Sequence, residues 1–144
     1  MRYLDTSSLV ALYFPETKTD PLIRHLQRRK SPLAFTWLHE IEFTNGLQLK
    51  VFRNEADEAA VNATLNTLRS DVESGVFQRP PISWPGVFER ATVISQAQTS
   101  SQGTRTLDLL HVAAAIALGA DEFITGDDRQ AKVAALEGLN VVKM

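Results

Sequence analysis

The chain has 144 residues, 44% of them hydrophobic, which is enough to build one folded domain and excludes a disordered chain. Its 15 Lys and Arg residues stand against 17 Asp and Glu residues, so the net charge is -2 and any polyanionic ligand must be held locally. The chain has no Cys, which excludes disulfides, thiolate nucleophiles and Cys-ligated zinc.

The start of the chain and its apolar segments bear on where the protein works. Met1 begins an apolar segment of strand length directly, without the charged and apolar regions of a signal peptide. No uncharged run is long enough to cross a bilayer. We therefore expect a cytoplasmic protein that has no contact with a membrane.

Apolar runs of strand length alternate with segments of helical period along the whole chain. This alternation predicts an α/β fold: one domain over residues 1–144, in which a parallel sheet of about four or five strands carries helices on both faces. The expected strands are residues 1–4, 33–36, 76–79, 121–125 and 140–142. The expected helices are residues 6–12, one from 19 or 20, 38–53, one between Asn54 as its cap and Gly75, 84–98, 107–118 and 129–136, with a loop at 100–103.

Four acidic residues recur where this fold places the carboxyl ends of its strands. Asp5 follows the first strand, Asp127 follows the strand at 121–125, and Asp108 lies in the first turn of the most apolar helix. Glu42 lies early in the helix at 38–53. Each residue has an ordinary explanation as a helix cap or as a complement to the helix dipole, but open α/β sheets bind ligands at this edge. Their joint occurrence predicts a shared acidic site.

Converging carboxylates raise one another's pKa, and a hard divalent cation is the usual way to keep several of them ionised. An all-carboxylate set without Cys suits Mg²⁺ or Mn²⁺ better than zinc. Such an ion activates water and neutralises charge on a phosphoryl oxygen, so the set points to phosphodiester hydrolysis.

Two choices of residue stay open at this stage. Glu40 and Glu42 lie about 200° apart around one helix, so only one of them can point into a shared site. Asp127 and Asp128 are adjacent, and either could be the acid that follows its strand.

Several other side chains are candidates for supporting roles. Thr6 and Thr125 could orient a carboxylate or a water, and Arg105 and Arg129 flank two of the acids and could hold phosphates of a substrate. His111, three residues after Asp108, could bond that carboxylate, and we expect it to be a packed, hydrogen-bonded structural residue. The other two histidines, His25 and His39, look incidental.

Four ordered motifs resemble those of PIN-domain ribonucleases, in particular the VapC toxins of VapBC toxin–antitoxin modules. The first motif runs from Tyr3 through Asp5 to Tyr13 with Pro15 and Glu16 after it. The others are Glu42-Phe43-Thr44-Asn45-Gly46-Leu47, Thr106-Leu107-Asp108-Leu109-Leu110-His111-Val112-Ala113-Ala114-Ala115 and Phe123-Ile124-Thr125-Gly126-Asp127-Asp128-Arg129. The resemblance covers essentially the whole chain, and its second motif favours Glu42 over Glu40.

The resemblance implies a single PIN-like domain that is a Mg²⁺- or Mn²⁺-dependent endoribonuclease toxin. The metal ligands would be Asp5, Glu42, Asp108 and Asp127, with Thr125 also in the site. It further implies a homodimer, an RNA substrate and neutralisation by a cognate VapB-type antitoxin. The alternatives are a non-catalytic PIN-like module that binds RNA or protein, and a metal-dependent enzyme that acts on DNA flaps or small phosphoesters.

Overall fold

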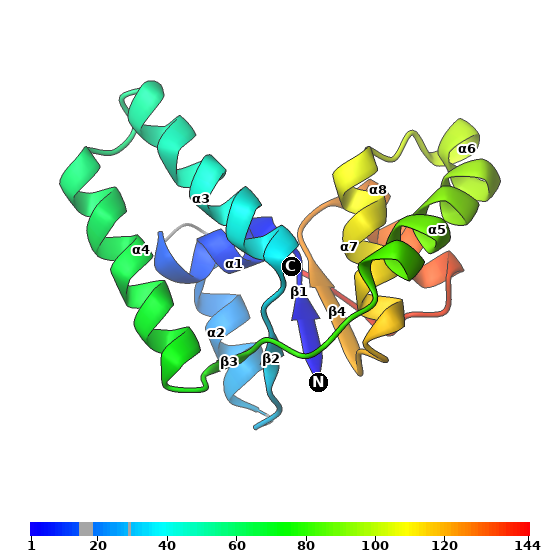
Figure 1. Cartoon of the computed structure of the whole chain (residues 1–144), viewed down its shortest axis with the longest axis horizontal. Helices are drawn as coiled ribbons and strands as arrows, with labels where there is room; N and C mark the ends of the chain where they lie inside the picture. The colour runs from blue at the N-terminus through cyan, green and yellow to red at the C-terminus, as the bar shows by residue number, and fades with distance from the viewer. Residues whose placement is uncertain (15–18, 29) are drawn as a thin grey trace.

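In the computed structural model, which describes residues 1–14, 19–28 and 30–144, five strands form one parallel sheet (Figure 1). The strand order is β3-β2-β1-β4-β5, and every neighbouring pair is parallel. The strands are β1 (Arg2–Leu4), β2 (Leu33–Ala34), β3 (Phe77–Gln78), β4 (Glu122–Thr125) and β5 (Val141–Lys143). The predicted α/β fold is confirmed, and β3 lies at one edge of the sheet, as its short apolar run indicated.

The helices lie between the strands in the chain, as a parallel sheet requires. Their bounds are α1 (Thr6–Tyr13), α2 (Thr19–Gln27), α3 (Trp37–Phe52), α4 (Glu58–Glu73), α5 (Trp84–Ile94), the π-helical turn η1 (Ser95–Thr99), α6 (Ser100–Gln102), α7 (Thr106–Ala117) and α8 (Asp128–Leu136). Figure 1 shows α1 to α4 on one side of the central strands and α5 to α8 on the other.

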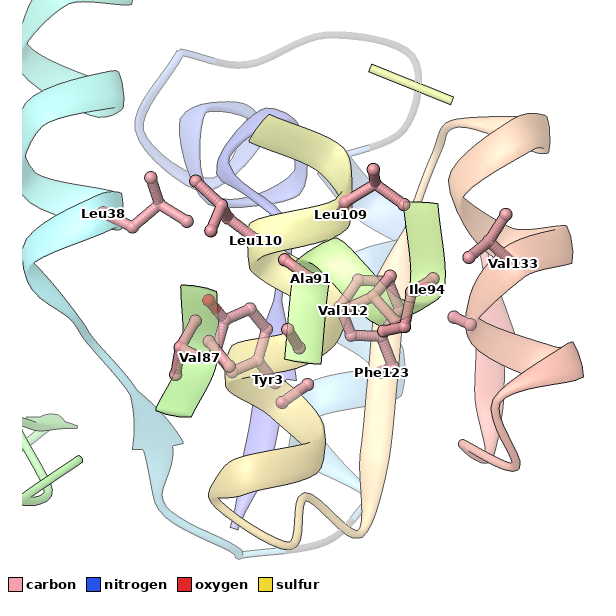
Figure 2. Close-up of a cluster of buried hydrophobic side chains, with 14 of the residues drawn as sticks. Tyr3, Leu38, Val87, Ala91, Ile94, Leu109, Leu110, Val112, Phe123 and Val133 are labelled. Carbon is pink, nitrogen blue, oxygen red and sulfur yellow. The ribbon is translucent and has the colours of Figure 1, made fainter. Parts of the chain in front are cut away.

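The two faces of the sheet are covered by separate apolar clusters. Successive strand residues point to opposite faces, so Tyr3 and Phe123 enter one cluster while Leu4 and Ile124 enter the other. The first cluster includes side chains from α5, α7 and α8 (Figure 2), and the second includes side chains from α1 to α4. The expectation of helices on both faces is therefore confirmed.

The most apolar helix, α7, is buried as its composition predicts. Its residues from Leu109 to Ala115 are all buried, and the alanines allow α7 to pack closely against the sheet and α5. This packing fixes the position of the first turn of α7, which carries Asp108.

Three local predictions of where a helix or strand begins or ends were wrong. Asn54 does not cap α4; it adopts a left-handed conformation (φ 56°) just after α3, and Asp57 caps α4 by accepting a hydrogen bond from Ala60 N at 2.7 Å. Thr36 ends no strand, because its side chain caps α3. The expected loop at 100–103 is helical up to Gln102, since η1 carries the helix onward.

Pro15 and Glu16, which belong to the first motif, lie outside the described residues. Within the residues that the structure does describe, no helix is long and apolar enough to cross a membrane.

Candidate active site

The carboxyl ends of β1 and β4 bring Asp5 and Thr125 together. The two strands pair with Leu4 opposite Ile124, and Asp5 N donates to Ile124 O at 2.8 Å. The Thr125 hydroxyl lies 2.8 Å from Asp5 Oδ2, and its oxygen accepts a hydrogen bond from Asp127 N at 3.0 Å. Thr125 thus links the acid after β1 to the acid after β4.

Asp5 is both a helix cap and a buried acid. Its Oδ1 accepts from Ser8 N at 2.7 Å, and Oδ2 accepts from the Ser7 hydroxyl at 2.8 Å as well as from Thr125. The side chain is 4% exposed. Because these donors approach from α1 and β4, the carboxylate is held in one orientation at the edge of the sheet.

Asp127 and Asp128 have different surroundings. Asp127 caps α8, and its Oδ1 accepts from Arg129 N at 2.8 Å and from Gln130 N at 2.9 Å. Asp128 is exposed and forms an ion pair with Lys143 at the end of β5. Only Asp127 is joined to Thr125, so the geometry favours Asp127 as the acid of the candidate site.

Asp108 lies close enough to Asp127 for their charges to interact. Burial raises the pKa of the Asp108 carboxyl, and the negative charge of Asp127 raises it further. Arg105 N donates a hydrogen bond to Asp108 Oδ2 at 3.3 Å, which lowers the pKa and so opposes these two effects. A carboxylate that is destabilised by a second carboxylate is the electrostatic arrangement that a cation relieves.

Glu42 is held by two side chains from other helices. The Thr6 hydroxyl donates to Glu42 Oε2 at 2.7 Å, and His111 Nε2 also contacts Oε2. Burial alone raises the Glu42 pKa, but the interactions with His111 and the hydrogen bond from Thr6 outweigh it, so the pKa lies below its usual value. The suggested partner of His111 was wrong: it contacts Glu42 from α3 and not Asp108 from its own helix.

Glu40, the competing acid on α3, points elsewhere. It is exposed and forms an ion pair with Arg79 at 2.7 Å.

The buried Tyr3 phenol lies near two of the predicted acids. Burial raises the pKa of the Tyr3 phenol, and the charges of both Glu42 and Asp5 raise it further. The charges of Glu42 and Asp5 therefore both raise the pKa of the buried Tyr3 phenol, whereas Glu40 pairs with Arg79.

Two buried side chains at this edge were missed by the sequence interpretation. His39 is 0% exposed; its Nε2 donates to Leu4 O at 2.7 Å, while Nδ1 accepts from Thr36 N at 3.0 Å. Gln130, 1% exposed, places Oε1 2.7 Å from the Thr125 hydroxyl and donates from Nε2 to Asp108 O at 3.4 Å. The available signal was position: each lies in the first turn of a helix that follows a strand.

The two arginines lie beside the acids on the surface. Arg105 precedes α7, and Arg129 donates to Gly103 O at 3.4 Å from the first turn of α8. Both are exposed. Next to Asp127, a pocket of about 230 Å³ opens between α1 and the segment after β4, lined by Ser7, Ser8, Ala11, Leu22, Gly126, Asp127 and Met144.

The donor set bears on whether a metal ion fits here. All four acids offer oxygen, the ligand that Mg²⁺ and Mn²⁺ prefer. Within the part of the chain that the structure describes, no three of the His, Asp or Glu side chains already form a metal cluster. The interaction between Asp108 and Asp127 and the placement of Asp5 nevertheless match a cation site in chemistry, because they bring hard anionic oxygens to one edge of the sheet.

Comparisons with known proteins agree with this architecture. The family model of the PIN domain matches residues 2–136. A chain of the FitAcB structure from Neisseria gonorrhoeae is similar, with a TM-score of 0.69 and 16% identity over 99% of this chain and 97% of that one. So is a chain of VapBC2 from Rickettsia felis bound to a DNA fragment from its promoter, with a TM-score of 0.68 and 15% identity over 100% and 99%.

At these identities the solved structures establish the fold, and no curated protein matches the chain significantly in sequence. The family model spans all four acids and both strands that carry the edge of the site. This protein therefore belongs to the PIN-domain family.

Proposed function

We propose that this protein is a metal-dependent endoribonuclease of the VapC type, the toxin of a type II toxin–antitoxin system. The observation that carries the proposal is the link from Asp5 through Thr125 to Asp127 at the edge of the sheet, with Asp108 close enough for the charge of Asp127 to raise its pKa. Membership of the PIN family supports nuclease chemistry. The similar complexes FitAcB and VapBC2 support a VapB-type antitoxin as the partner.

The chain's own residues divide the work of phosphodiester hydrolysis. Asp5, Asp108, Asp127 and Glu42 would hold Mg²⁺ or Mn²⁺. The bound ion would supply an activated water and neutralise charge on the phosphoryl group. Thr125 orients Asp5, and Thr6 orients Glu42, through the hydrogen bonds described above. Arg105 and Arg129, which are exposed beside Asp108 and Asp127, would hold phosphates of the RNA.

Three further properties belong to the same proposal. The substrate is RNA, the protein acts in the cytoplasm, and it forms a homodimer. The dimer is supported by exposed apolar side chains on α3 and α5, since such a patch on a soluble domain usually marks an interface.

The test is cleavage of total RNA by the purified chain, separated from any co-purifying partner, with Mg²⁺, Mn²⁺ or EDTA. Two matched pairs of variants test which acids belong to the site: Asp127→Asn is compared with Asp128→Asn, and Glu42→Gln with Glu40→Gln. We expect metal-dependent fragments whose formation falls at least about 100-fold in the first variant of each pair and is unchanged in the second. An equal response within both pairs, or cutting in EDTA, contradicts the proposal; RNA bound but never cut would indicate the non-catalytic binding module.

A further inference from the structure

A line of hydrogen bonds leads from the apolar core to Glu42. Tyr3 is 0% exposed, and its hydroxyl lies 2.8 Å from His111 Nδ1. His111 is 2% exposed, and its Nε2 contacts Glu42 Oε2. The line joins a central strand (β1), the buried helix α7 and the helix α3, which are far apart in the sequence.

The direction of each hydrogen bond follows from the chemistry of the groups. An ionised carboxylate only accepts, so His111 Nε2 carries the proton and donates to Glu42. In a neutral imidazole Nδ1 is then the acceptor, and the Tyr3 hydroxyl donates to it. Glu42 thereby fixes the proton of His111 on Nε2, and the hydrogen bond from Tyr3 to Nδ1 stabilises that tautomer.

The same contacts leave the two oxygens of Glu42 unequal. Oε2 accepts from both His111 and Thr6, at 2.7 Å for Thr6. Among the residues that the structure describes, Oε1 has no hydrogen-bond partner. Glu42 therefore has one oxygen engaged by the protein and one oxygen available to a ligand.

The Tyr3 end of this line of hydrogen bonds is rigid. The Tyr3 ring stacks on Phe123 with centroids 5.7 Å apart and an interplanar angle of 15°, and it contacts the His39 ring at 4.7 Å. Figure 2 shows Tyr3 and Phe123 within the buried cluster between the sheet and α7. Because densely packed rings cannot change rotamer independently, the position of the Tyr3 hydroxyl is set by the core.

We propose that Tyr3 and His111 are positioning residues, which hold Glu42 so that its Oε1 alone is presented to the divalent cation. The inference rests on the proposed function, because it takes the metal site as given. It adds that the site is oriented from inside the core, through a tautomer of His111 that the buried hydroxyl of Tyr3 stabilises. Residues that orient a metal ligand typically affect metal affinity by about 10–100-fold, although they do not touch the ion.

The first test needs neither metal nor activity. Nitrogen-15 NMR of the metal-free protein at neutral pH is expected to show His111 protonated at Nε2 and not at Nδ1. In Tyr3→Phe, which removes only the hydroxyl, the preference for that tautomer should weaken. Tyr13→Phe is the matched control, because its hydroxyl donates to Asp71 at 2.6 Å and does not contact His111. Protonation of His111 at Nδ1 in the parent protein overturns the proposal.

The second test measures the affinity of the protein for Mn²⁺ alone, by titration calorimetry. His111→Leu should bind Mn²⁺ at least about 10-fold more weakly than the parent, and His111→Gln, whose amide can still donate towards Glu42, should recover part of the loss. Tyr3→Phe should bind more weakly than Tyr13→Phe. Equal affinities in His111→Leu and the parent, or in Tyr3→Phe and Tyr13→Phe, overturn the proposal.

RNA cleavage, measured in parallel, separates the two proposals. Mn²⁺ binding that depends on His111, in a protein that cuts no RNA, would retain the positioning role and reject the nuclease. Metal-dependent cleavage, together with an Mn²⁺ affinity that is equal in His111→Leu and the parent, would retain the nuclease and reject the positioning role. Should His111→Leu fail to fold, the NMR comparison of Tyr3→Phe with Tyr13→Phe still decides the question.

Discussion

At the scale of single residues, the contrast between Glu40 and Glu42 shows how position on one helix decides chemistry. Glu42 is half-buried and meets Thr6 and His111, whereas Glu40 is exposed and meets Arg79. The helical period predicts that only one of them can enter a shared site. Which one does so depends on where α1 and α7 lie against α3, and the helical period alone carries no information on that.

Asp127 and Asp108 provide a prediction at the same scale. Replacing Asp127 by Asn removes a negative charge near Asp108, so the raised pKa of the Asp108 carboxyl should move down towards its ordinary value. Carbon-13 NMR of the side-chain carboxyls during a pH titration measures this shift. Asp128→Asn is the control, since Asp128 is exposed and paired with Lys143. A pKa that stays unchanged in Asp127→Asn would mean that the two acids do not interact.

At the scale of elements, the N-terminus of α3 is tied to the end of β1 by His39. The imidazole accepts from Thr36 N and donates to Leu4 O, directly before Asp5. This link sets the distance between the helix that carries Glu42 and the strand that carries Asp5. A polar residue in the first turn of a helix suggests a cap, but its second bond, to a strand 35 residues earlier, exists only in the folded chain.

Burial, with the nearby His111 adding to it, lowers the pKa of His39 to about 3. The unfolded chain takes up a proton at about 6.5, so folding is not penalised above that pH. As the pH falls from about 6.5 towards 3, only the unfolded state gains this proton, and the free energy of unfolding decreases by up to about 1.4 kcal/mol per pH unit.

Denaturant unfolding of the parent and of His39→Gln at pH 7 and pH 5 checks this prediction. The variant should be less stable at pH 7, because it loses buried hydrogen bonds, yet its stability should fall less between the two pH values. An identical loss of stability in both proteins would show that His39 takes up its proton in the folded state.

At the scale of the whole molecule, an apolar surface crosses α3 and α5. Trp37, Ile41 and Phe88 are 60%, 64% and 56% exposed. Together with Leu38, Trp84 and Leu110, they line a groove of about 340 Å³. The Arg79 guanidinium stacks over the Trp37 ring at 4.0 Å and borders this surface. The proposed homodimer would bury these side chains.

Ile41→Glu and Phe88→Glu test the dimer by sedimentation velocity at several protein concentrations. The parent should sediment as a dimer, and each variant should dissociate at concentrations at least about 10-fold higher, as loss of a central apolar contact predicts. Phe52→Glu is the control, since Phe52 is 83% exposed at the end of α3 and outside the groove. A monomeric parent, or a dimer that is insensitive to both groove variants, would contradict this interface.

Alternating apolar runs and helical periods were sufficient to predict the parallel sheet, its approximate strands and the helices on both faces, because these patterns are local and repeat at fixed intervals. The same patterns selected Asp5 and Asp127, because the carboxyl end of a strand can be located from the apolar run that precedes it. Asp108 was selected as the acid in the first turn of the most apolar helix, and Glu42 was preferred to Glu40 only by the resemblance to a known family. The patterns failed where an element ended by a cap or continued through a π turn, as at Asn54 and residues 100–103, because such endings depend on a few competing hydrogen bonds.

By itself, then, the sequence determined the fold class, and it nominated the candidate acids, since both depend on spacing along the chain. Only the tertiary structure decided the partners of those acids: Glu42 with His111 and Thr6, Asp5 with Thr125, and His39 with Leu4. Hydrogen bonds act over about 3 Å, and the separation of two side chains from distant elements is set to that accuracy only by the packing of the helices on the sheet.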